Sequence, residues 1–452
     1  MTEAGYLLSE SPFENLDDYR ARGGGDGIAE ALRIGPEATI EMVTEARLRG
    51  RGGAGFPTGI KWSGVASANS DQRRFVVCNA AEGEPGTFKD RTLIRANPYQ
   101  VLEGLAIAAF AIGAEEAYVG IKQKYAVEVE RLESAAGEMD DAGLLGEIPI
   151  RLVTGPDDYL LGEEKGLLEA IEGRQPLPRW LPPYVVGLYV AETSGLGAAT
   201  SGWDDQYNPT VVNNVETLGH VPPLLARGAD WFRSHGTEDT PGTVLFTVCG
   251  DVLRETVVEL AAGTPLAVLV YGIGGGLGAG RKVSAVFPGA SNAPLPARLL
   301  DTPLDYGSMA AAGSGMGSGG MIVYDDTACV LDAAAQLSRF LAVESCGQCP
   351  PCKLGTGALT DLLVELESGR ARPHNVEEIV GWAQRVTDAN RCGLGAGERS
   401  LIAGLLSNFP EVVSAHLDRG CPSERTLVLS KIVDHEGDRF LYDETYFDWR
   451  QP

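Results

Sequence analysis

Long apolar runs are missing from this 452-residue sequence, and so is an apolar segment behind a basic N-terminus. No stretch reaches the roughly 18 uninterrupted apolar residues that a helix needs to cross a bilayer. Residues Met1–Gly5 do not begin a secretory signal, which would start with basic residues followed by apolar ones. We therefore expect a protein of the cytoplasm. Any contact with a membrane is expected to be made through partners.

Basic residues are also scarce, with 37 Lys and Arg against 62 Asp and Glu and a formal net charge of −25. Such a chain lacks the broad basic surface that nucleic-acid phosphates require, so nucleic-acid binding is excluded as a main function. An anionic ligand would have to be held by a local group of cations. The length and the 44% hydrophobic content suit roughly two to four domains with cores of their own.

One segment does collect positive charge. Residues Ala46–Ser63 contain no acid and have five glycines between Gly50 and Gly59. Its cations are Arg47, Arg49, Arg51 and Lys61. Glycines let the backbone approach a ligand and turn its N–H groups toward phosphate oxygens, so the segment is typical of a nucleotide phosphate cradle. It is not a Walker loop. A glycine-rich turn taken alone is about as often a plain loop as a ligand site.

Eight cysteines are present, but their spacing gives no disulfide framework. Three follow one another at two-residue spacers and a fourth lies further along: Cys346, Cys349, Cys352 and Cys392. One loop with three thiolates and a second segment with the fourth is what a cubane iron–sulfur cluster needs, so we predict an electron-transfer protein. Structural zinc is the main alternative. It usually takes two C-x-x-C pairs, or a pair with histidines, and no histidine lies near this triple.

The other four cysteines lie singly, without partner spacing: Cys78, Cys249, Cys329 and Cys421. We interpret each of them as a buried or incidental thiol. The sequence contains no second set of four clustered cysteines, so a second iron–sulfur centre would have to sit on another chain.

Two strand ends carry polar residues suited to a ligand. The apolar run Phe75–Cys78 leads into a glycine-containing loop with Asn79, Glu82 and Glu84, whose side chains could hold a heterocycle, hydroxyls or an amide. The residues around Gly162 follow a second apolar run and precede a helical pattern. A solvated turn and a helix N-terminus with favourable acids explain the two segments about equally well.

Six strings occur in one order along the chain: GRGGAGFPTGIKW at 50–62, NAAEGEPGTFKDR at 79–91, GEE at 162–164, PTVVNNVETL at 209–218, GSGMGSGGMIV at 313–323 and ESCGQCPPCKLGTG at 344–357. Together they resemble the NADH-binding flavin subunit of respiratory complex I. The same family includes the diaphorase subunits of NAD-linked hydrogenases and formate dehydrogenases. The resemblance covers about residues 47–405. It implies an NADH dehydrogenase in which FMN takes hydride-derived electrons and a 4Fe-4S cluster passes them to a partner subunit.

The resemblance also implies roles for particular residues. Those expected around FMN are Gly52, Lys61, Asn79, Glu82, Tyr159, Gly162, Asn213, Asn214 and Thr217. Those expected at NADH are Phe56, Glu84 and Glu164, and the cluster ligands are the four cysteines at 346, 349, 352 and 392. No protein acid or nucleophile is needed, because the flavin carries the chemistry. The implied partners are a small thioredoxin-like 2Fe-2S subunit and further iron–sulfur subunits of a larger complex.

Three positions depart from the family pattern. Ala81 stands where the family has an aspartate, Gly64 where it has an aromatic ring, and Lys165 where it has a threonine. These changes indicate a divergent member and leave the electron donor open. The alternative hypothesis is an electron relay or scaffold that keeps the cluster but has lost NADH turnover.

The expected fold class is α/β, with three domains between two terminal segments. Helical and strand patterns alternate first, short strands joined by turns follow, and helical spacing dominates later. With the resemblance, the segments are an N-terminal arm (1–40), a Rossmann-like FMN- and NADH-binding domain (41–235), a ubiquitin-like β-grasp domain (236–312), a helical iron–sulfur domain (313–421) and a tail (422–452). The acidic, aromatic-rich tail either docks a partner or folds back on its own domain.

Overall fold

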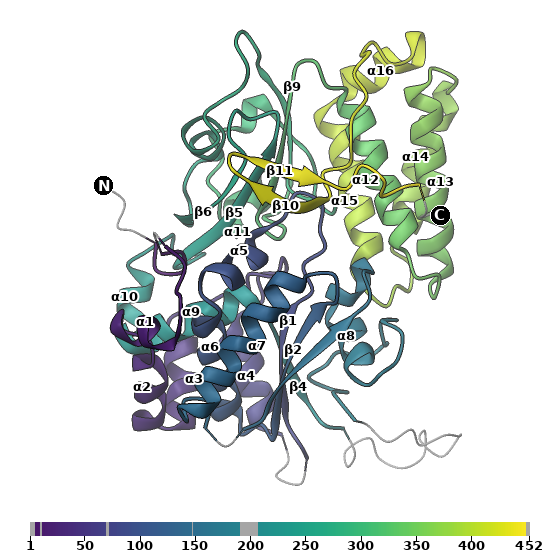
Figure 1. Ribbon diagram of the computed structural model, residues 1–452. Helices are drawn as coiled ribbons and strands as arrows, with labels where there is room; N and C mark the ends of the chain where they lie inside the picture. Colours follow the sequence, from purple (N-terminus) through teal and green to yellow (C-terminus); the bar gives the residue numbers. More distant parts are fainter. Residues whose placement is uncertain (1–4, 10, 69–71, 147, 190–206, 449–452) are drawn as a thin grey trace, which may run out of the picture. The chain divides into compact units, whose positions relative to one another are not determined.

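The computed structural model describes residues 5–9, 11–68, 72–146, 148–189 and 207–448 (Figure 1). They form two compact units. The first unit comprises Met1–Glu82 and Asp90–Thr243, and the second comprises Gly83–Lys89 and Val244–Pro452. The loop Gly83–Lys89 therefore belongs to the second unit although its flanks belong to the first. The boundaries of the five predicted segments remain predictions.

The first unit is built on a four-stranded parallel sheet with strand order β3-β2-β1-β4. Its strands are β1 (Phe75–Ala80), β2 (Glu116–Lys122), β3 (Ile150–Gly155) and β4 (Thr210–Asn214). The chain passes from β1 outward to β2 and β3, and then returns to place β4 on the other side of β1. The strand order therefore reverses between β1 and β4, where open α/β sheets bind ligands. The predicted Rossmann-like core is confirmed.

Helices of the first unit pack on and beside this sheet. They are α1 (Leu16–Ala21), α2 (Asp26–Ile34), α3 (Pro36–Glu45), α4 (Thr58–Ala66), α5 (Lys89–Ala96), α6 (Pro98–Ile112), α7 (Ala126–Asp141), α8 (Glu164–Ile171), α9 (Val215–Arg227) and α10 (Ala229–Arg233), with a 3₁₀ turn η1 (Tyr159–Gly162) before α8. Phe75 and Val77 of β1 share a core cluster with α8, so Val76 and Cys78 point to the other face, where α6 contacts the strand. A central strand buried on both faces explains the uninterrupted apolar run in the sequence.

Helix α6 shows how local sequence sets these elements. The Asn97 side chain accepts a hydrogen bond from the Gln100 N–H, and Pro98 occupies the first turn, where its missing N–H costs nothing. Gly113 ends the helix in the left-handed conformation with φ of 66°. Nearly all of the helix is buried, so it forms the centre of the unit rather than its surface.

The second unit contains a five-stranded mixed sheet and a helical bundle. The sheet order is β6-β5-β9-β7-β8, with β5 parallel to β9 and with β7 antiparallel to both of its neighbours. Its strands are β5 (Thr243–Gly250), β6 (Thr256–Ala261), β7 (Val283–Phe287), β8 (Leu295–Pro296) and β9 (Gly320–Asp325), with a π-helix η3 (Val268–Ile273), a 3₁₀ turn η4 (Ala297–Leu299) and α11 (Tyr306–Ala311) between strands. This sheet lies where the small β domain was expected.

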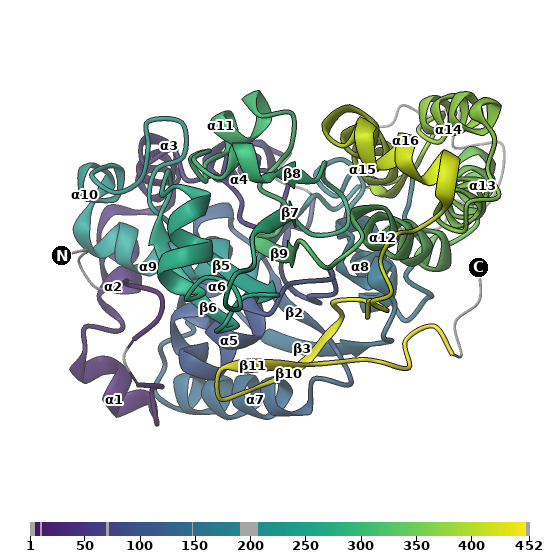
Figure 2. The same ribbon diagram turned by 90° about the horizontal axis from the view of Figure 1, so that it is seen from above.

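Five helices follow the mixed sheet in sequence and gather as a bundle (Figure 2). They are α12 (Val330–Glu344), α13 (Pro350–Glu367), α14 (Pro373–Arg385), α15 (Leu394–Asn408) and α16 (Pro410–Arg419). The predicted C-terminal helical bundle is thereby confirmed. In the described part of the chain, no helix combines the length and the apolar character that would let it span a bilayer.

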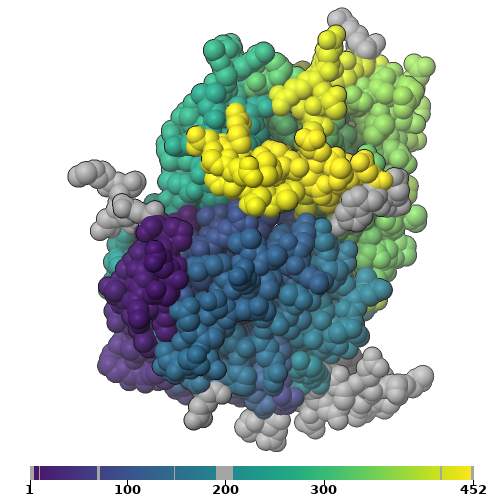
Figure 3. Space-filling view, viewed as in Figure 1, coloured from purple at the N-terminus to yellow at the C-terminus, as the bar shows by residue number. Residues whose placement is uncertain are grey.

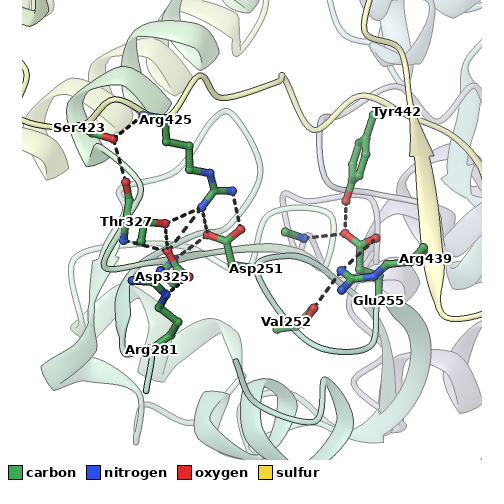
Figure 4. Close-up of polar contacts among 11 residues, drawn as sticks. Asp251, Val252, Glu255, Arg281, Asp325, Thr327, Ser423, Arg425, Arg439 and Tyr442 are labelled. Atoms are coloured by element: carbon green, nitrogen blue, oxygen red, sulfur yellow. Dashed lines mark hydrogen bonds and ion pairs between the residues drawn. The ribbon is translucent and has the colours of Figure 1, made fainter. Parts of the chain in front are cut away.

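The C-terminal segment, described to residue 448, folds back on its own unit, as one of the two alternatives for the tail predicted. It forms the hairpin β10 (Ile432–Glu436) and β11 (Arg439–Tyr442) and appears as a yellow band at the surface (Figure 3). Upstream of the hairpin, the Arg425 guanidinium donates to both Asp251 carboxylate oxygens at 2.6 and 2.8 Å (Figure 4). Downstream, Tyr446 is buried and its ring packs against Phe340 of α12.

Candidate functional site

The glycine-rich loop before α4 is closed by its own backbone. The Gly50 N–H donates to the Phe56 carbonyl at 2.9 Å, and the Arg51 N–H donates to the Thr217 hydroxyl at the start of α9 at 2.8 Å. Between these anchors, the N–H groups of residues 52–55 make no hydrogen bond within the described part of the chain. A Cβ on Gly52 would lie 3.2 Å from the Asn214 Cβ, so this loop lies against the end of β4. Open N–H groups beside a strand end suit an anionic ligand.

The cations of this segment are each paired with carboxylates distant in sequence. Arg47 lies 3.6 Å from Glu238, and Arg49 lies 2.8 Å from Asp239. The buried Arg51 lies 4.0 Å from Glu216 and also donates to the Pro241 carbonyl. The loop therefore offers a ligand mainly its backbone N–H groups, and less positive charge than the local sequence suggests.

Lys61 of α4 joins three elements at the sheet edge. Its Nζ lies 2.5 Å from the Glu164 carboxylate at the start of α8 and donates to the Val212 carbonyl of β4 at 2.9 Å. The next residue, Trp62, is fully buried and its indole N–H donates to Asn213 at 2.8 Å. Lys61 and Asn213, both predicted site residues, are thus brought to the same strand. Trp62 was not predicted, and its only signal in the sequence was its position beside Lys61.

The ends of β1 and β4 place two predicted asparagines next to each other. Asn79 and Asn214 are register partners on these parallel strands. The Asn79 side chain donates to the Gly162 carbonyl at 2.8 Å, and Asn214 donates to the Asp90 carboxylate at 2.7 Å and caps α9. A Cβ on Gly162 would lie 2.8 Å from the Ala81 carbonyl oxygen, so only glycine allows this approach. Asp90 is a second residue that sequence reasoning missed.

Tyr159 lies in the 3₁₀ turn that ends at Gly162, directly before α8. The α8 N-cap is Glu163, whose carboxylate accepts the N–H groups of Lys165 and Gly166 at 2.9 Å. Burial raises the pKa of Glu163, while the Lys165 side chain 3.8 Å away opposes that shift. Lys165 therefore lies within ion-pair distance of the cap carboxylate.

The residues predicted at NADH differ in exposure. The Phe56 ring is half exposed at 50%, and the Glu164 side chain is 44% exposed. Glu84 lies in the second unit, where its carboxylate accepts the Ala290 N–H at 2.8 Å. Glu82, predicted at FMN, is buried and accepts hydrogen bonds from the Asp90 N–H and from Arg91 at 3.1 and 3.0 Å.

Two of the three residues that depart from the family pattern, Ala81 and Gly64, lie in different surroundings. Ala81 is buried in the core cluster that lines one face of the sheet. A Cβ on Gly64 would meet nothing within 4 Å, so space for a larger side chain exists there. The first change removes a carboxylate from a packed position, whereas the second leaves an open position on α4.

The predicted cluster cysteines lie at the N-terminal ends of two helices of the bundle. Cys349 is the N-cap of α13, and Cys392 stands directly before Gly393, the N-cap of α15. Helix N-termini stabilise thiolates and the negative charge of an iron–sulfur cluster. The Arg391 N–H donates to the Cys349 sulfur at 3.3 Å, which brings the remote cysteine segment against the three-cysteine loop.

Further contacts hold the three-cysteine loop. Gln348 donates to the Cys346 sulfur at 3.6 Å, and the Ser345 hydroxyl lies 3.4 Å from the Cys352 sulfur. Burial raises the pKa of the Cys352 thiol, Ser345 opposes the shift, and Cys349 and Cys346 add to it. Four soft thiol ligands from two segments, with donors directed at the sulfurs, fit a 4Fe-4S cluster.

Comparisons with known proteins agree with both the flavin prediction and the iron–sulfur prediction. A family model of the Nuo51 FMN-binding domain matches residues 43–223. A second family model, of the NADH-ubiquinone oxidoreductase-F iron-sulfur binding region, matches residues 332–416. The chain is 39% identical over 420 residues to the NADH-quinone oxidoreductase F 2 subunit of Rhizobium meliloti (strain 1021), a match that covers 90% of this chain and 96% of the relative. This chain belongs to the family of NADH-quinone oxidoreductase F subunits.

Two further relatives show the breadth of this family. The NADP-reducing hydrogenase subunit HndC of Solidesulfovibrio fructosivorans is 35% identical over 432 residues, covering 93% of this chain and 85% of the relative. The crystal structure of an NAD⁺-reducing NiFe-hydrogenase in the H₂-reduced state matches with a TM-score of 0.77 and 32% identity, over 90% of this chain and 68% of that chain.

The predicted family, fold class, function and cofactors are therefore confirmed. The chain is an NADH-oxidising flavin and iron–sulfur subunit that binds FMN and a 4Fe-4S cluster. Its relatives are subunits, so it works within a larger assembly. The roles of the individual residues remain predictions.

Proposed function

We propose that FMN binds at the carboxyl ends of β1 and β4, and that this chain delivers NADH-derived electrons through its cluster to a separate 2Fe-2S subunit. The observation that carries the proposal is the pairing of Asn79 with Asn214 at the point where the strand order reverses. The open N–H groups of residues 52–55 lie beside that point and fit the flavin phosphate.

The roles of the other residues follow from their contacts. Lys61, Asn213 and Thr217 hold the loop, α4 and β4 together around the flavin position. Tyr159 and Gly162 line it from the turn before α8, and Glu82 orders the neighbouring loop through Arg91. When bound, FMN accepts two electrons as hydride and releases them singly. The protein supplies no acid or nucleophile and instead positions, stacks and excludes water.

Phe56 and Glu164 are proposed to bind the nicotinamide nucleotide. Both were predicted at NADH, both lie in the first unit, and both side chains are exposed to solvent. Glu84, which lies in the second unit, is proposed to bind a hydroxyl or an amide of NADH, as the resemblance implies. Its carboxylate accepts the Ala290 N–H at 2.8 Å.

The thiolates of the four predicted cysteines are proposed to hold the 4Fe-4S cluster, which carries one electron at a time. The sequence has no second four-cysteine set, so the next acceptor belongs to another chain. A small thioredoxin-like 2Fe-2S subunit and further iron–sulfur subunits are the proposed partners. The chain is proposed to reach the inner face of the membrane only through them.

Lys61→Met tests the flavin position. Loss of a charged hydrogen-bond donor costs about 1.5–3 kcal/mol, so the FMN dissociation constant should rise roughly 10- to 100-fold. The matched control is Ile60→Met, which changes an exposed neighbour on the same helix. Flavin content and affinity are measured by fluorescence after anaerobic purification. Equal flavin affinity in the two variants would show that Lys61 does not contribute to flavin binding.

The departures at Ala81, Gly64 and Lys165 leave open how well this chain uses NADH compared with NADPH. Anaerobic stopped-flow mixing with NADH and with NADPH tests this, because hydride transfer bleaches the oxidised flavin absorbance. Faster bleaching by one nucleotide identifies the preferred donor. A flavin-loaded protein that neither nucleotide reduces would contradict the dehydrogenase function and would instead be an electron relay.

A further inference from the structure

Three metal-binding side chains meet in the helical bundle, outside the predicted cluster loop. They are Cys329, His416 and Cys421, and their donor atoms all lie within 4.8 Å of one another. The Cys329 sulfur lies 3.3 Å from the His416 Nε2. Both of these side chains are buried, and Cys421 is half-buried. The interpretation of Cys329 and Cys421 as isolated thiols therefore misses their shared position.

The histidine is oriented as metal-binding histidines are. Its Nδ1 lies 2.7 Å from the Val412 carbonyl oxygen one turn earlier in α16. A carbonyl only accepts hydrogen bonds, so the neutral ring carries its proton on Nδ1 and directs the Nε2 lone pair to the Cys329 sulfur. A metal-ligating histidine typically donates its other N–H to a backbone carbonyl in this way.

Each cysteine is also fixed by backbone contacts. Cys329 is the N-cap of α12, and its sulfur accepts the Asp332 N–H at 3.4 Å. Cys421 follows Gly420, whose φ of 72° turns the chain at the end of α16, and the Cys421 N–H donates to the Glu367 carbonyl at 2.9 Å.

We propose that Cys329, His416 and Cys421 bind one zinc ion, separate from the iron–sulfur cluster. Zinc ligands at about 2.0–2.3 Å in a tetrahedron lie roughly 3.3–3.8 Å apart, which the observed spacing accommodates with small side-chain rotations. Two thiolates and one imidazole form the donor set that zinc prefers. Among the described residues this set supplies three of the four ligands that tetrahedral zinc takes.

The ion would act as a structural link. It ties the start of α12 to α16 and to the segment that leads into the C-terminal tail. The neighbouring Ser423 hydroxyl already donates to the Thr327 carbonyl before α12 at 2.8 Å (Figure 4). The other end of α12, at Glu344, leads directly into the three-cysteine loop. Zinc at one end of α12 therefore steadies the helix from which the cluster loop begins.

The test is the metal content of the full chain, purified anaerobically from zinc-supplemented medium. Wild-type protein should hold about one zinc beside the roughly four irons of its cluster. Zinc-edge X-ray absorption should show two sulfurs at about 2.3 Å and a lighter shell at about 2.0–2.1 Å. Cys421→Ser and His416→Gln should lose the zinc and keep the iron. Cys249→Ser, at a buried thiol elsewhere in the same unit, is the control and should keep both metals.

Three results would overturn the proposal. Wild-type protein that carries no zinc, and takes up none from stoichiometric Zn²⁺ after thiol reduction, has no such site. A zinc shell of four sulfurs would place the ion in the cluster site instead. A Cys329–Cys421 disulfide in non-reduced peptide maps would identify a redox pair. Because the wild-type spectrum decides between these outcomes, the test stands even if a variant fails to fold, and it is independent of the proposed NADH reaction.

Discussion

The buried Glu255 carboxylate holds the C-terminal hairpin through several hydrogen bonds. Removing one of its hydrogen-bond donors should therefore loosen the hairpin. The Glu255 carboxylate accepts the N–H groups of Gly250 and Phe440, each at 2.8 Å. It also accepts the Tyr442 hydroxyl (Figure 4). The side chain is only 3% exposed. Burial raises the pKa of Tyr442, and Cys249 and Glu255 add to the shift, so the hydroxyl stays protonated and donates. A buried carboxylate depends on such donors because water cannot replace them.

Tyr442→Phe removes this hydroxyl and keeps the ring. A hydrogen bond to a charged group contributes about 1.5–3 kcal/mol, and the two N–H donors to Glu255 remain in place. At about 1.4 kcal/mol for each factor of ten, the hairpin should open roughly 10- to 100-fold more often. The effect should extend to the loop at 83–89, because the Gly86 N–H donates to the Ser430 carbonyl and Lys431 donates to the Gly83 carbonyl.

Hydrogen exchange measured by mass spectrometry tests this prediction, because it reports local opening segment by segment. Peptides covering β10, β11 and residues 83–89 should lose protection, whereas β1 to β4 should not change. Tyr271→Phe is the matched control, since that tyrosine is half exposed. Hairpin protection equal to wild type in Tyr442→Phe would show that the Glu255 contacts do not hold the tail.

Three further outcomes are expected. Cys349→Ser should abolish the EPR signal of the reduced cluster and leave bound flavin, and a persisting signal would exclude that ligand. Gly162→Ala should lower flavin content, because its Cβ would lie 2.8 Å from the Ala81 carbonyl oxygen. Gly64→Ala is the control and should keep its flavin, because the space around Gly64 is open. Equal flavin content in the two variants would show that flavin binding does not need the close approach of Gly162 to Ala81. Burial raises the pKa of Glu398 from 4.5 to about 8, so between these values the folded chain holds a proton that the unfolded chain has released. Thermal stability should fall as pH rises through that range, and Glu398→Gln should weaken this dependence of stability on pH. If the variant shows the same dependence on pH as wild type, other groups cause it.

Much of the fold could be predicted from local pattern. The run Phe75–Cys78 is apolar at every position because β1 is buried on both faces, and that is the mark of a central parallel strand. The structure extends this strand to Ala80, so Asn79, expected in the following loop, lies at the end of β1, where such sheets bind ligands. The three-cysteine spacing is likewise local, since one loop supplies three ligands.

The rest depends on long-range packing. Cys329 and Cys421 stand far apart in sequence, and only the contacts of α12 with α16 bring them together with His416. The return of the tail was open for the same reason, because Glu255 and Tyr442 carry no pattern that links them. Side chains that meet through tertiary structure leave no periodicity in the sequence.

The glycine-rich segment shows the same limit for electrostatics. Its cations have no acid among their sequence neighbours, yet Lys61 meets Glu164 and Arg49 meets Asp239. A count of local charge therefore overstates the field at the loop, because paired ions nearly cancel beyond a few ångströms. A phosphate bound there must draw most of its stabilisation from the open N–H groups of residues 52–55. If FMN binds as proposed, backbone geometry at the glycines should affect flavin affinity more than the arginine charges do.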